Sequence, residues 1–425
     1  MNLRKIALQA FADIVDHDAY ANLRLKQLPD SLSERDTSWI TALVYTSLDH
    51  LLTIDYYLAA FVSQPTKPVI RNVLRLGTCE LLFFGTPSHA AISEYVQLTR
   101  QLGKGALSGF VNAVLRKVDR ERDQLPTLPS DPIARLSIRF SYPEWLIQEW
   151  VLQYGLDWTE RLLSSPPAPM EIRAQFPCTT EQLLSLIPAA GVSRGKLDAN
   201  CLLLKEGMDV AALPAFQQGL LTVQSQSAML VCRALGDCRG KQVLDVCAAP
   251  GGKSAYLASL CENDIDLTCF ELYEHRKQLI DRTFARLHVS AKVLCRDACV
   301  PEMDLSNHFD AVLIDAPCSG LGLLHDKPDI RYRKSDADID ALAQVQKELL
   351  HVNAAYVRPG GYLLYATCTI SRRENEDQTA NFLAAHPDFS LDPLPIPLSN
   401  AGMLQLLPHV HGCDGFFMAR FKKHA

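Results

Sequence analysis

From residue 223 onward, short apolar runs alternate with amphipathic stretches, and this alternation restricts the fold more than any other feature of the chain. Apolar runs of strand length separated by helix-length segments are typical of βαβ units with parallel strands. The pattern predicts a doubly wound, Rossmann-like α/β domain over 223–425, to which Gly415–Phe421 would add an edge strand. The expected strands are 242–246, 266–271, 291–296, 309–315 and 361–367, and the expected helices are 254–261, 274–288, 337–357 and 373–385.

Residues 1–125 carry apolar side chains at the spacing of a single helix face, i, i+3, i+4 and i+7. Because the pattern continues through the whole segment, we expect a compact all-α bundle with these side chains in its core. Three stripes define it: Ile6, Phe11, Ile14 and Val15; Val69, Ile70, Val73 and Leu74; and Leu107, Phe110, Val111, Val114, Leu115 and Val118.

A proline-rich linker is predicted after the bundle, since Pro126, Pro129, Pro132 and Pro143 cannot continue a helix. Residues 170–222 alternate short apolar runs with turns, which is typical of a small α+β module. The expected domains are therefore 1–125, 126–222 and 223–425.

Length and composition favour a cytoplasmic protein with several buried cores. The chain has 425 residues, of which 48% are hydrophobic. No run reaches the roughly 18 apolar residues that a membrane span needs, and the N-terminus has an amphipathic pattern in place of an apolar signal segment. We therefore expect no membrane partner.

The thirteen cysteines are irregularly spaced, with no C-x-x-C pair and no Cys/His cluster at zinc-ligand spacing. This usage indicates a reduced protein and predicts no metal site. Most of the cysteines, such as Cys79, Cys232 and Cys269, are expected to act as small buried hydrophobes.

The net charge of −6 argues against a broadly basic nucleic-acid-binding surface. The first 125 residues hold fourteen Lys and Arg against thirteen Asp and Glu, a net +1, so the remainder carries −7. Contacts to RNA would then depend on local basic patches. The candidates are Arg173, Arg194, Lys196, Arg331, Arg333 and Lys334.

A ligand turn is predicted directly after the first strand, where a Gly-Gly step precedes a helix. Backbone amides of such a turn face the ligand, which suits a nucleotide-like or zwitterionic molecule. The turn is neither G-x-G-x-x-G nor a P-loop. Glu271 ends the second strand, where a carboxylate can accept ribose hydroxyls, and Asp297 ends the third. The turn consists of Cys247, Ala248, Ala249, Pro250, Gly251, Gly252 and Lys253.

Two cysteines follow two further strands. Cys318 lies in Asp315–Gly320 and Cys368 in Tyr365–Thr369. Because parallel strands place their carboxyl ends at one edge of the sheet, the two thiols are expected at the same rim as the ligand turn. A single thiol there would be read as a core residue, whereas two in separate motifs indicate chemistry.

On these motifs the chain resembles the RsmB family, also called Sun or Fmu, of S-adenosylmethionine-dependent cytosine-C5 RNA methyltransferases, over nearly its whole length. The Cys247–Lys253 turn is similar to the family's cofactor loop, and the Pro-Cys and Thr-Cys pairs are its hallmark. Asp329–Tyr332 and Gly415–Phe417 also fit. The resemblance implies a helical NusB-like RNA-binding domain, a small α+β linker domain and a C-terminal class I methyltransferase domain that binds S-adenosylmethionine.

The resemblance also implies the roles of the site residues. Cys368 would be the nucleophile that adds to carbon 6 of cytosine, because carbon 5 attacks a methyl group only after such an addition. Cys318 would assist removal of the C5 proton and release of the product. Asp315 would contact the cofactor and hydrogen-bond the base near N3, with its carboxyl either partly protonated or paired with a donor. Lys253 would either lower the pKa of a nearby thiol or bind the cofactor's carboxylate.

The implied substrate is 16S ribosomal RNA before or during subunit assembly, with the target base in a loop or single strand. We expect a monomer. Transfer RNA as substrate and a catalytically inactive assembly factor remain alternatives, while the missing G-x-G-x-x-G disfavours a nicotinamide dehydrogenase. DNA cytosine methyltransferases differ because their attacking cysteine lies in the Pro-Cys motif. Glu271 stands where the family more often has Asp.

Overall fold

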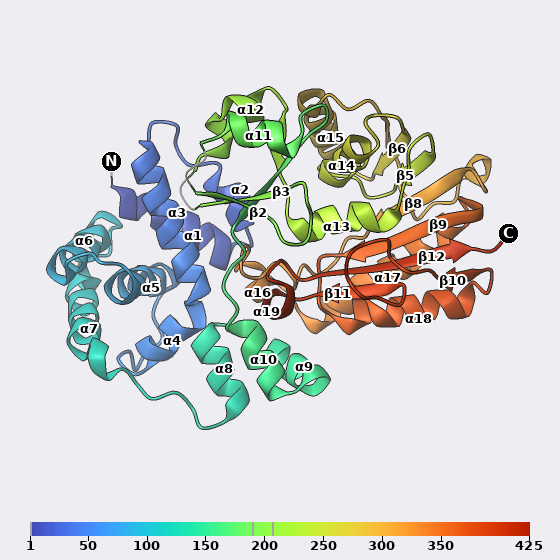
Figure 1. The fold of residues 1–425 in the computed structure, drawn as a ribbon. Coiled ribbons are helices and arrows are strands. Elements are labelled where there is room, and N and C mark those ends of the chain that lie inside the picture. Colours follow the sequence, from blue (N-terminus) through green and yellow to red (C-terminus); the bar gives the residue numbers. More distant parts are fainter. Residues whose placement is uncertain (1, 189–190, 206–207) are drawn as a thin grey trace. The chain divides into compact units, whose positions relative to one another are not determined.

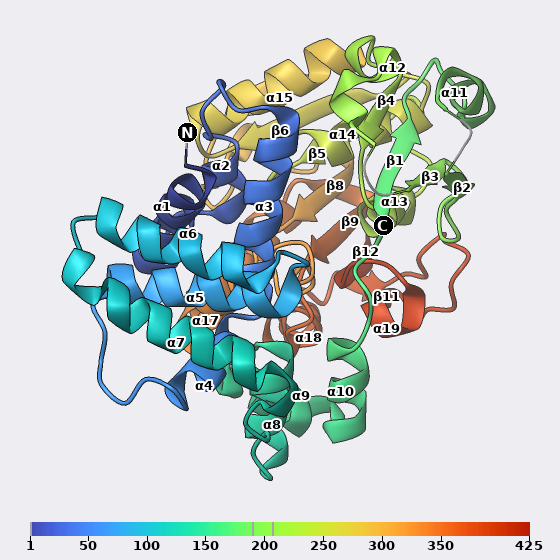
Figure 2. The same ribbon diagram turned by 90° about the vertical axis from the view of Figure 1, so that its left-hand side faces the viewer.

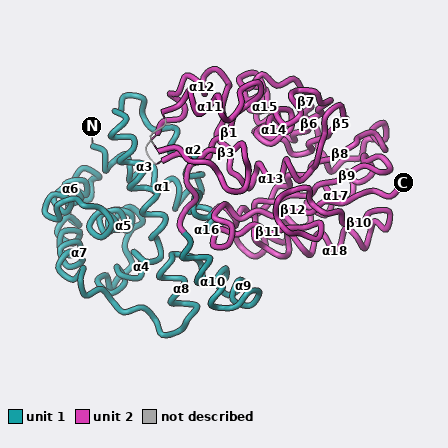
Figure 3. Tube along the Cα trace, viewed as in Figure 1, with its two compact units in different colours: residues 1–165, 324–333 teal, residues 166–323, 334–425 magenta. Residues whose placement is uncertain are grey.

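The computed structural model describes residues 2–188, 191–205 and 208–425. The chain forms two compact units (Figures 1 and 3). Unit 1 consists of residues 1–165 and 324–333, and unit 2 of residues 166–323 and 334–425. Among the helices of the described residues, none has both the length and the apolar character of a membrane span.

Unit 1 is all-α, as predicted for its first 125 residues. Figure 2 shows α5, α6 and α7 side by side, and the three predicted apolar stripes lie in or against one continuous core. Asn2 and Ser33 cap α1 and α3 by accepting from the amides of Lys5 and Asp36. The helices are α1 (Leu3–Asp16), α2 (Ala21–Leu25), α3 (Glu34–Asp49), α4 (Leu51–Ala59), α5 (Pro68–Phe83), α6 (Ser88–Gln101), α7 (Ser108–Glu121), α8 (Pro132–Phe140), α9 (Glu144–Tyr154), α10 (Leu156–Leu163) and α16 (Ile330–Arg333), with short 3₁₀ turns η1 (Gly105–Leu107) and η2 (Arg122–Gln124).

The predicted linker is only partly irregular, because α8 lies within it. Pro132 occupies the first turn of α8, where its missing amide costs no hydrogen bond, and the Asp131 carboxylate caps the helix by accepting from Ala134 N at 2.8 Å. The prediction that Pro132 belongs to an irregular linker was therefore wrong, because this proline begins a helix.

Residues 324–333 belong to unit 1 although their neighbours in the chain lie in unit 2. Arg331 Nη2 donates to Asp49 Oδ1 at 3.0 Å, Tyr332 OH donates to the Leu48 carbonyl at 2.8 Å, and Ala21 N donates to Asp329 Oδ2 at 3.3 Å. The Asp329–Tyr332 motif thus fixes this segment within unit 1. The Arg331 side chain is only 4% exposed, and its guanidinium lies over the Tyr142 ring, so it does not form part of a surface patch.

Unit 2 contains a small antiparallel sheet in the order β2-β3-β1-β4. This agrees with the predicted α+β module. Its core contains Ile172, Leu183, Leu202 and Leu221. The elements are β1 (Met170–Ala174), α11 (Thr180–Leu186), β2 (Val192–Arg194), β3 (Cys201–Leu204), η3 (Val210–Ala212), α12 (Pro214–Gln217) and β4 (Leu221–Val223).

The larger sheet of unit 2 has the order β10-β12-β9-β8-β5-β6-β7, with β11 also pairing with β12. Strands β5 to β9 are parallel, as predicted. One apolar cluster includes side chains of α13, α14 and α15, and another those of α17 and α18, so both faces are covered. The strands are β5 (Gln242–Asp245), β6 (Asp266–Glu271), β7 (Lys292–Cys295), β8 (Phe309–Asp315), β9 (Val357–Thr367), β10 (Phe389–Leu391), β11 (Met403–Leu406) and β12 (Phe416–Lys423). The helices are α13 (Gln226–Leu235), α14 (Gly252–Leu260), α15 (Glu274–Leu287), η4 (Met303–Leu305), α17 (Asp336–Ala354), η5 (Arg372–Glu374), α18 (Glu376–Ala385) and α19 (Pro408–His411).

The last strand is not at the edge of the sheet, contrary to the prediction. β12 pairs antiparallel with β9 on one side and with both β10 and β11 on the other. Its side chains from Phe416 to Phe421 are buried, as expected for an internal strand with both faces covered.

Candidate active site

The turn between β5 and α14 is shaped by two glycines. Gly251 has φ +98°, and a Cβ there would lie 3.2 Å from the Phe284 ring. A Cβ on Gly252 would meet nothing within 4 Å, so there is open space beside the first turn of α14. The amides of that turn have no partner within the helix and can donate to an anionic group.

Three carboxylates lie at the ends of β5, β6 and β7. Asp245 is buried and its Oδ2 accepts from Ser254 Oγ at 2.5 Å, whereas its Oδ1 has no partner among the described residues. Glu271 is buried and accepts from Tyr273 N at 3.2 Å. Asp297 is exposed just after β7 and accepts from Cys299 N at 2.9 Å. The open turn and these acceptors fit a ligand with an amino-acid part and a ribose.

Burial of Asp245 predicts a stability that depends on pH. Burial raises the pKa of this carboxyl to about 6 from the usual 3.8, and the Ser254 hydroxyl offsets only part of the effect. A raised pKa means that the folded state favours the proton, so the associated stability is present below pH 3.8 and lost as the pH rises to 6. The free energy of unfolding of Asp245→Asn, minus that of wild type, should increase by on the order of 3 kcal/mol from pH 4 to pH 7. Urea unfolding at both pH values measures this difference. A difference that is flat with pH would contradict this.

Lys253 and Asp315 form an ion pair across the ends of α14 and β8. Lys253 Nζ donates to Asp315 Oδ2 at 2.5 Å and lies 5.0 Å from the centre of the Phe416 ring. Burial lowers the pKa of Lys253, but the charge and hydrogen bond of Asp315 outweigh it, so the net pKa is raised and the ammonium persists. Of the two states considered for Asp315, the structure has the one paired with a donor.

The two motif cysteines are in contact. Cys318 Sγ and Cys368 Sγ lie 3.2 Å apart, and both side chains are partly exposed. The hydrogen bond with Cys368 and burial together raise the pKa of the Cys318 thiol well above its usual range. Cys318 therefore keeps its proton at neutral pH and can donate it to the Cys368 sulfur.

A buried carboxylate that the sequence analysis missed joins the two cysteine loops. Glu374 accepts from Ser319 N at 2.8 Å, from Ser319 Oγ, and from Gln346 Nε2 at 3.0 Å. Ser319 Oγ also bonds Thr369 Oγ1 at 2.8 Å, so each cysteine has a neighbour in this network. A Glu six residues after Cys368 at a helix start was the available signal, but it reads equally well as an exposed helix cap.

Two glycines bring the cysteine loops close to the last strand. Gly322 N donates to the Cys368 carbonyl at 3.0 Å and Gly415 N donates to the Gly322 carbonyl at 2.9 Å. A Cβ on Gly322 would lie 1.9 Å from the Gly415 carbonyl oxygen, a distance that no side chain can tolerate. The Gly415–Phe417 motif therefore leaves room for the Cys318 loop to pass.

Gly322→Ala is expected to reduce both stability and activity, because the two backbones must separate and displace Cys368. The expected loss is about 1–3 kcal/mol in the free energy of unfolding, measured by thermal and urea denaturation. Gly109→Ala is the matched control, since its Cβ would meet nothing within 4 Å in α7. Wild-type stability and turnover in Gly322→Ala would show that the loops do not need this approach.

Four predicted residues form two pairs, Lys253 with Asp315 and Cys318 with Cys368. The pairs are near enough for Cys368 to contribute to the raised pKa of Lys253. The Cys247 side chain packs against the core. Cys79, Cys232 and Cys269 are buried, as predicted. Among the described residues, no group of three or more metal-ligating side chains is clustered.

The candidate residues for local basic patches differ in exposure and pairing. Arg173 is fully buried, so assigning it to RNA contact was wrong, as it was for Arg331. Arg194 is exposed but paired with Glu181 at 2.9 Å, and the Arg333 guanidinium lies 3.8 Å from the Tyr20 ring centre. Lys196 is exposed and Lys334 is partly exposed.

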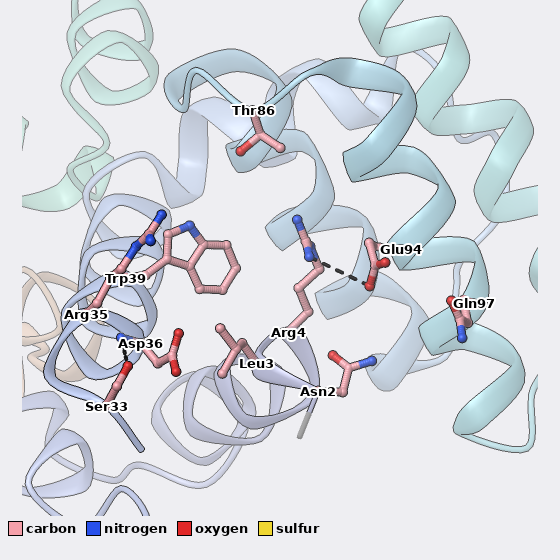
Figure 4. Close-up of a pocket in the computed structure, with 10 residues that line it drawn as sticks. All are labelled: Asn2, Leu3, Arg4, Ser33, Arg35, Asp36, Trp39, Thr86, Glu94 and Gln97. Carbon is pink, nitrogen blue, oxygen red and sulfur yellow. Dashed lines mark hydrogen bonds and ion pairs between the residues drawn. The ribbon is translucent and has the colours of Figure 1, made fainter.

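A separate hollow of about 830 Å³ lies within unit 1 (Figure 4). Arg4 faces Trp39 across it, 5.3 Å from the ring centre, and is paired with Glu80 at 2.5 Å and Glu94 at 3.7 Å. Arg4 and Arg35 in its lining are balanced by Asp36 and Glu94, so the hollow favours no charged ligand.

The doubly wound sheet, with the open turn at α14 and the paired thiols beyond the carboxyl ends of its parallel strands, is typical of a methyltransferase domain. Comparisons with known proteins agree. Residues 233–422 match the family described as 16S rRNA methyltransferase RsmB/F, and residues 1–120 match the NusB family.

The chain belongs to the ribosomal RNA small subunit methyltransferase B family, and it is an RNA methyltransferase. It is 36% identical to the probable ribosomal RNA small subunit methyltransferase B of Bacillus subtilis, over 99% of both chains. It is 33% identical to the Shewanella oneidensis protein, over 100% of this chain and 99% of that one. The crystal structure of PH0851 is similar with a TM-score of 0.83 and 25% identity, over 98% of both chains.

Proposed function

We propose that the protein transfers a methyl group from S-adenosylmethionine to carbon 5 of a cytosine in small-subunit ribosomal RNA, through a covalent bond between Cys368 and carbon 6. The observation that carries the proposal is the 3.2 Å contact between Cys318 and Cys368. The neighbouring Lys253–Asp315 pair supports it. Relatives named ribosomal RNA small subunit methyltransferase B support the choice of substrate.

The cofactor would be held by the turn after β5 and by acids at the strand ends. Amides of the first turn of α14 would receive its carboxylate, with the Lys253 ammonium nearby. Glu271 would accept the ribose hydroxyls, its extra methylene extending its reach relative to Asp, and Asp297 would lie near the base. When bound, S-adenosylmethionine supplies an electrophilic methyl group.

The two thiols would act in sequence. The Cys368 thiolate adds to carbon 6, and the displaced ring electrons make carbon 5 nucleophilic. Asp315, held by Lys253, hydrogen-bonds near N3, and the proton that N3 gains during addition would pass from the Lys253 ammonium through Asp315. After carbon 5 is methylated, Cys318 gives up its own proton to solvent and, as a thiolate, accepts the C5 proton, while N3 returns its proton to the Lys253–Asp315 pair. The C–H electron pair re-forms the ring double bond, and the Cys368–carbon bond breaks with its electrons returning to sulfur.

The substrate would be RNA before or during subunit assembly, with the target base outside a stack so that it can reach Cys368. Unit 1, as a NusB-like domain, would contribute RNA contacts. On this proposal the enzyme acts in the cytoplasm, where its substrate is made, and as a monomer, since the apolar stripes of unit 1 pack into its own core.

The test is methyl transfer from labelled S-adenosylmethionine to unmodified small-subunit ribosomal RNA, followed by mapping of 5-methylcytosine. A single labelled cytosine is the expected result. Labelling of transfer RNA alone would overturn the substrate and leave the chemistry standing. Cofactor binding without transfer to either RNA would favour an assembly factor.

A further inference from the structure

The small sheet of unit 2 contacts the helix that begins at the ligand turn. Arg173 Nη2 donates to the Gly252 carbonyl at 3.4 Å, Gln175 Nε2 to the Ala255 carbonyl at 3.5 Å, and Phe176 N to Ser259 Oγ at 2.9 Å. Positions 252, 255 and 259 share one face of a helix. The end of β1 therefore lies along α14, with Arg173 at the position of the turn.

Arg173 is an unusual residue in this place because its charge is buried without a carboxylate. It is 0% exposed. Nε donates to Gln224 Oε1 at 2.6 Å, Nη1 donates to Gln175 Oε1 at 2.5 Å, and the guanidinium lies 4.6 Å from the Tyr256 ring centre. These acceptors are neutral, and none of the ion pairs among the described residues includes Arg173.

Such a charge has an energetic cost that its own contacts do not offset. Burial lowers the pKa of Arg173 to about 10, so the guanidinium is still protonated at neutral pH. The N-terminus of a helix already carries a partial positive charge, and a cation placed behind it adds to the repulsion. The arrangement becomes favourable when an anionic group binds in front of the turn.

We propose that Arg173 is a positioning residue for the cofactor turn. It holds the Gly252 carbonyl from behind and raises the positive potential that receives the carboxylate of the cofactor. The inference rests on the proposed use of S-adenosylmethionine. It replaces the RNA contact first expected of Arg173 with a role in cofactor affinity.

Calorimetric titration of S-adenosylmethionine into wild type, Arg173→Met and Arg173→Lys tests the proposal. Methionine fills the space without the charge. The Kd of Arg173→Met for S-adenosylmethionine should therefore be about tenfold above that of wild type, or about 1.4 kcal/mol. Lysine keeps the charge but loses the planar guanidinium group, so the Kd of Arg173→Lys should lie between those of wild type and Arg173→Met. In turnover, the KM for the cofactor should rise while the KM for RNA stays constant.

Arg286→Met is the matched control, because Arg286 also joins this sheet to a helix of the larger domain. Its Nη1 donates to the Leu221 carbonyl at 3.0 Å and its Nη2 to Thr222 Oγ1 at 3.0 Å, from the end of α15. This variant should lose stability and keep its cofactor affinity. An equal loss of affinity in both Met variants would show a general structural effect and overturn the proposal.

Decarboxylated S-adenosylmethionine separates charge from structure. The loss caused by Arg173→Met should fall to about twofold or less with this ligand, since the group that Arg173 favours is gone. An undiminished loss overturns the proposal. If Arg173→Met does not fold, a folded Arg173→Lys that binds as tightly as wild type also overturns it. A wild type that binds neither ligand overturns the proposed function itself, whereas a wild type that binds with no effect of Arg173→Met overturns this inference alone.

Discussion

Cys368→Ala is expected to abolish methyl transfer, by roughly 10⁴-fold or more, because carbon 5 of cytosine stays unreactive without addition at carbon 6. The measurement is label transferred from S-adenosylmethionine to small-subunit ribosomal RNA under single-turnover conditions. Cofactor affinity should be unchanged, since Cys368 lies at the end of β9 and the cofactor turn follows β5.

The matched control is Cys178→Ala, which removes a partly exposed thiol in the small α+β module, outside both cysteine loops. It should transfer methyl groups at the wild-type rate. Substantial transfer by Cys368→Ala would contradict the proposed nucleophile, and the same assay on Cys318→Ala would then show whether the Pro-Cys thiol attacks, as in DNA cytosine methyltransferases.

Cys318→Ala is expected to accumulate a covalent protein–RNA complex. Addition and methyl transfer need only Cys368, whereas release needs removal of the C5 proton, which Cys318 assists. Loss of acid–base assistance slows such a step by roughly 10²–10⁴-fold, so the adduct should persist on a denaturing gel.

The double variant Cys318→Ala/Cys368→Ala identifies the attacking atom. The double variant should form no adduct. The adduct band of Cys318→Ala should also be absent when S-adenosylmethionine is omitted, if release and not addition is the step that is blocked. An adduct in the double variant would show that another nucleophile attacks. Rapid turnover by Cys318→Ala without any adduct would contradict the role given to this thiol.

The parallel strands and the rim that they form could be predicted because each leaves a local pattern. An apolar run followed by a turn and a helix specifies β5, β6 and β8 without reference to any distant residue. The position of β12 could not be predicted in this way. It is internal because β10 and β11, only three and four residues long, pair with its far side, and such short strands have no readable period.

Candidate site residues could be predicted where the residue type itself indicates chemistry. They were missed or misassigned where their role depends on whether a charged side chain is buried. Cys318 and Cys368 stand out as thiols at strand ends, and their contact follows from the parallel register. Glu374 and Arg173 have charged side chains that composition places at the surface, yet both are fully buried among polar partners from distant segments. Those partners come together only in the folded chain.

The assignment of residues 324–333 to unit 1 determines how this protein can be divided. The chain passes between the units at three points, 165/166, 323/324 and 333/334, so no single cut separates them. A fragment ending at 165 would leave the Asp49 carboxylate and the Leu48 carbonyl without Arg331 and Tyr332. Any chimaera that exchanges the N-terminal unit between relatives must therefore carry this ten-residue insert from the same parent as the helices that it contacts.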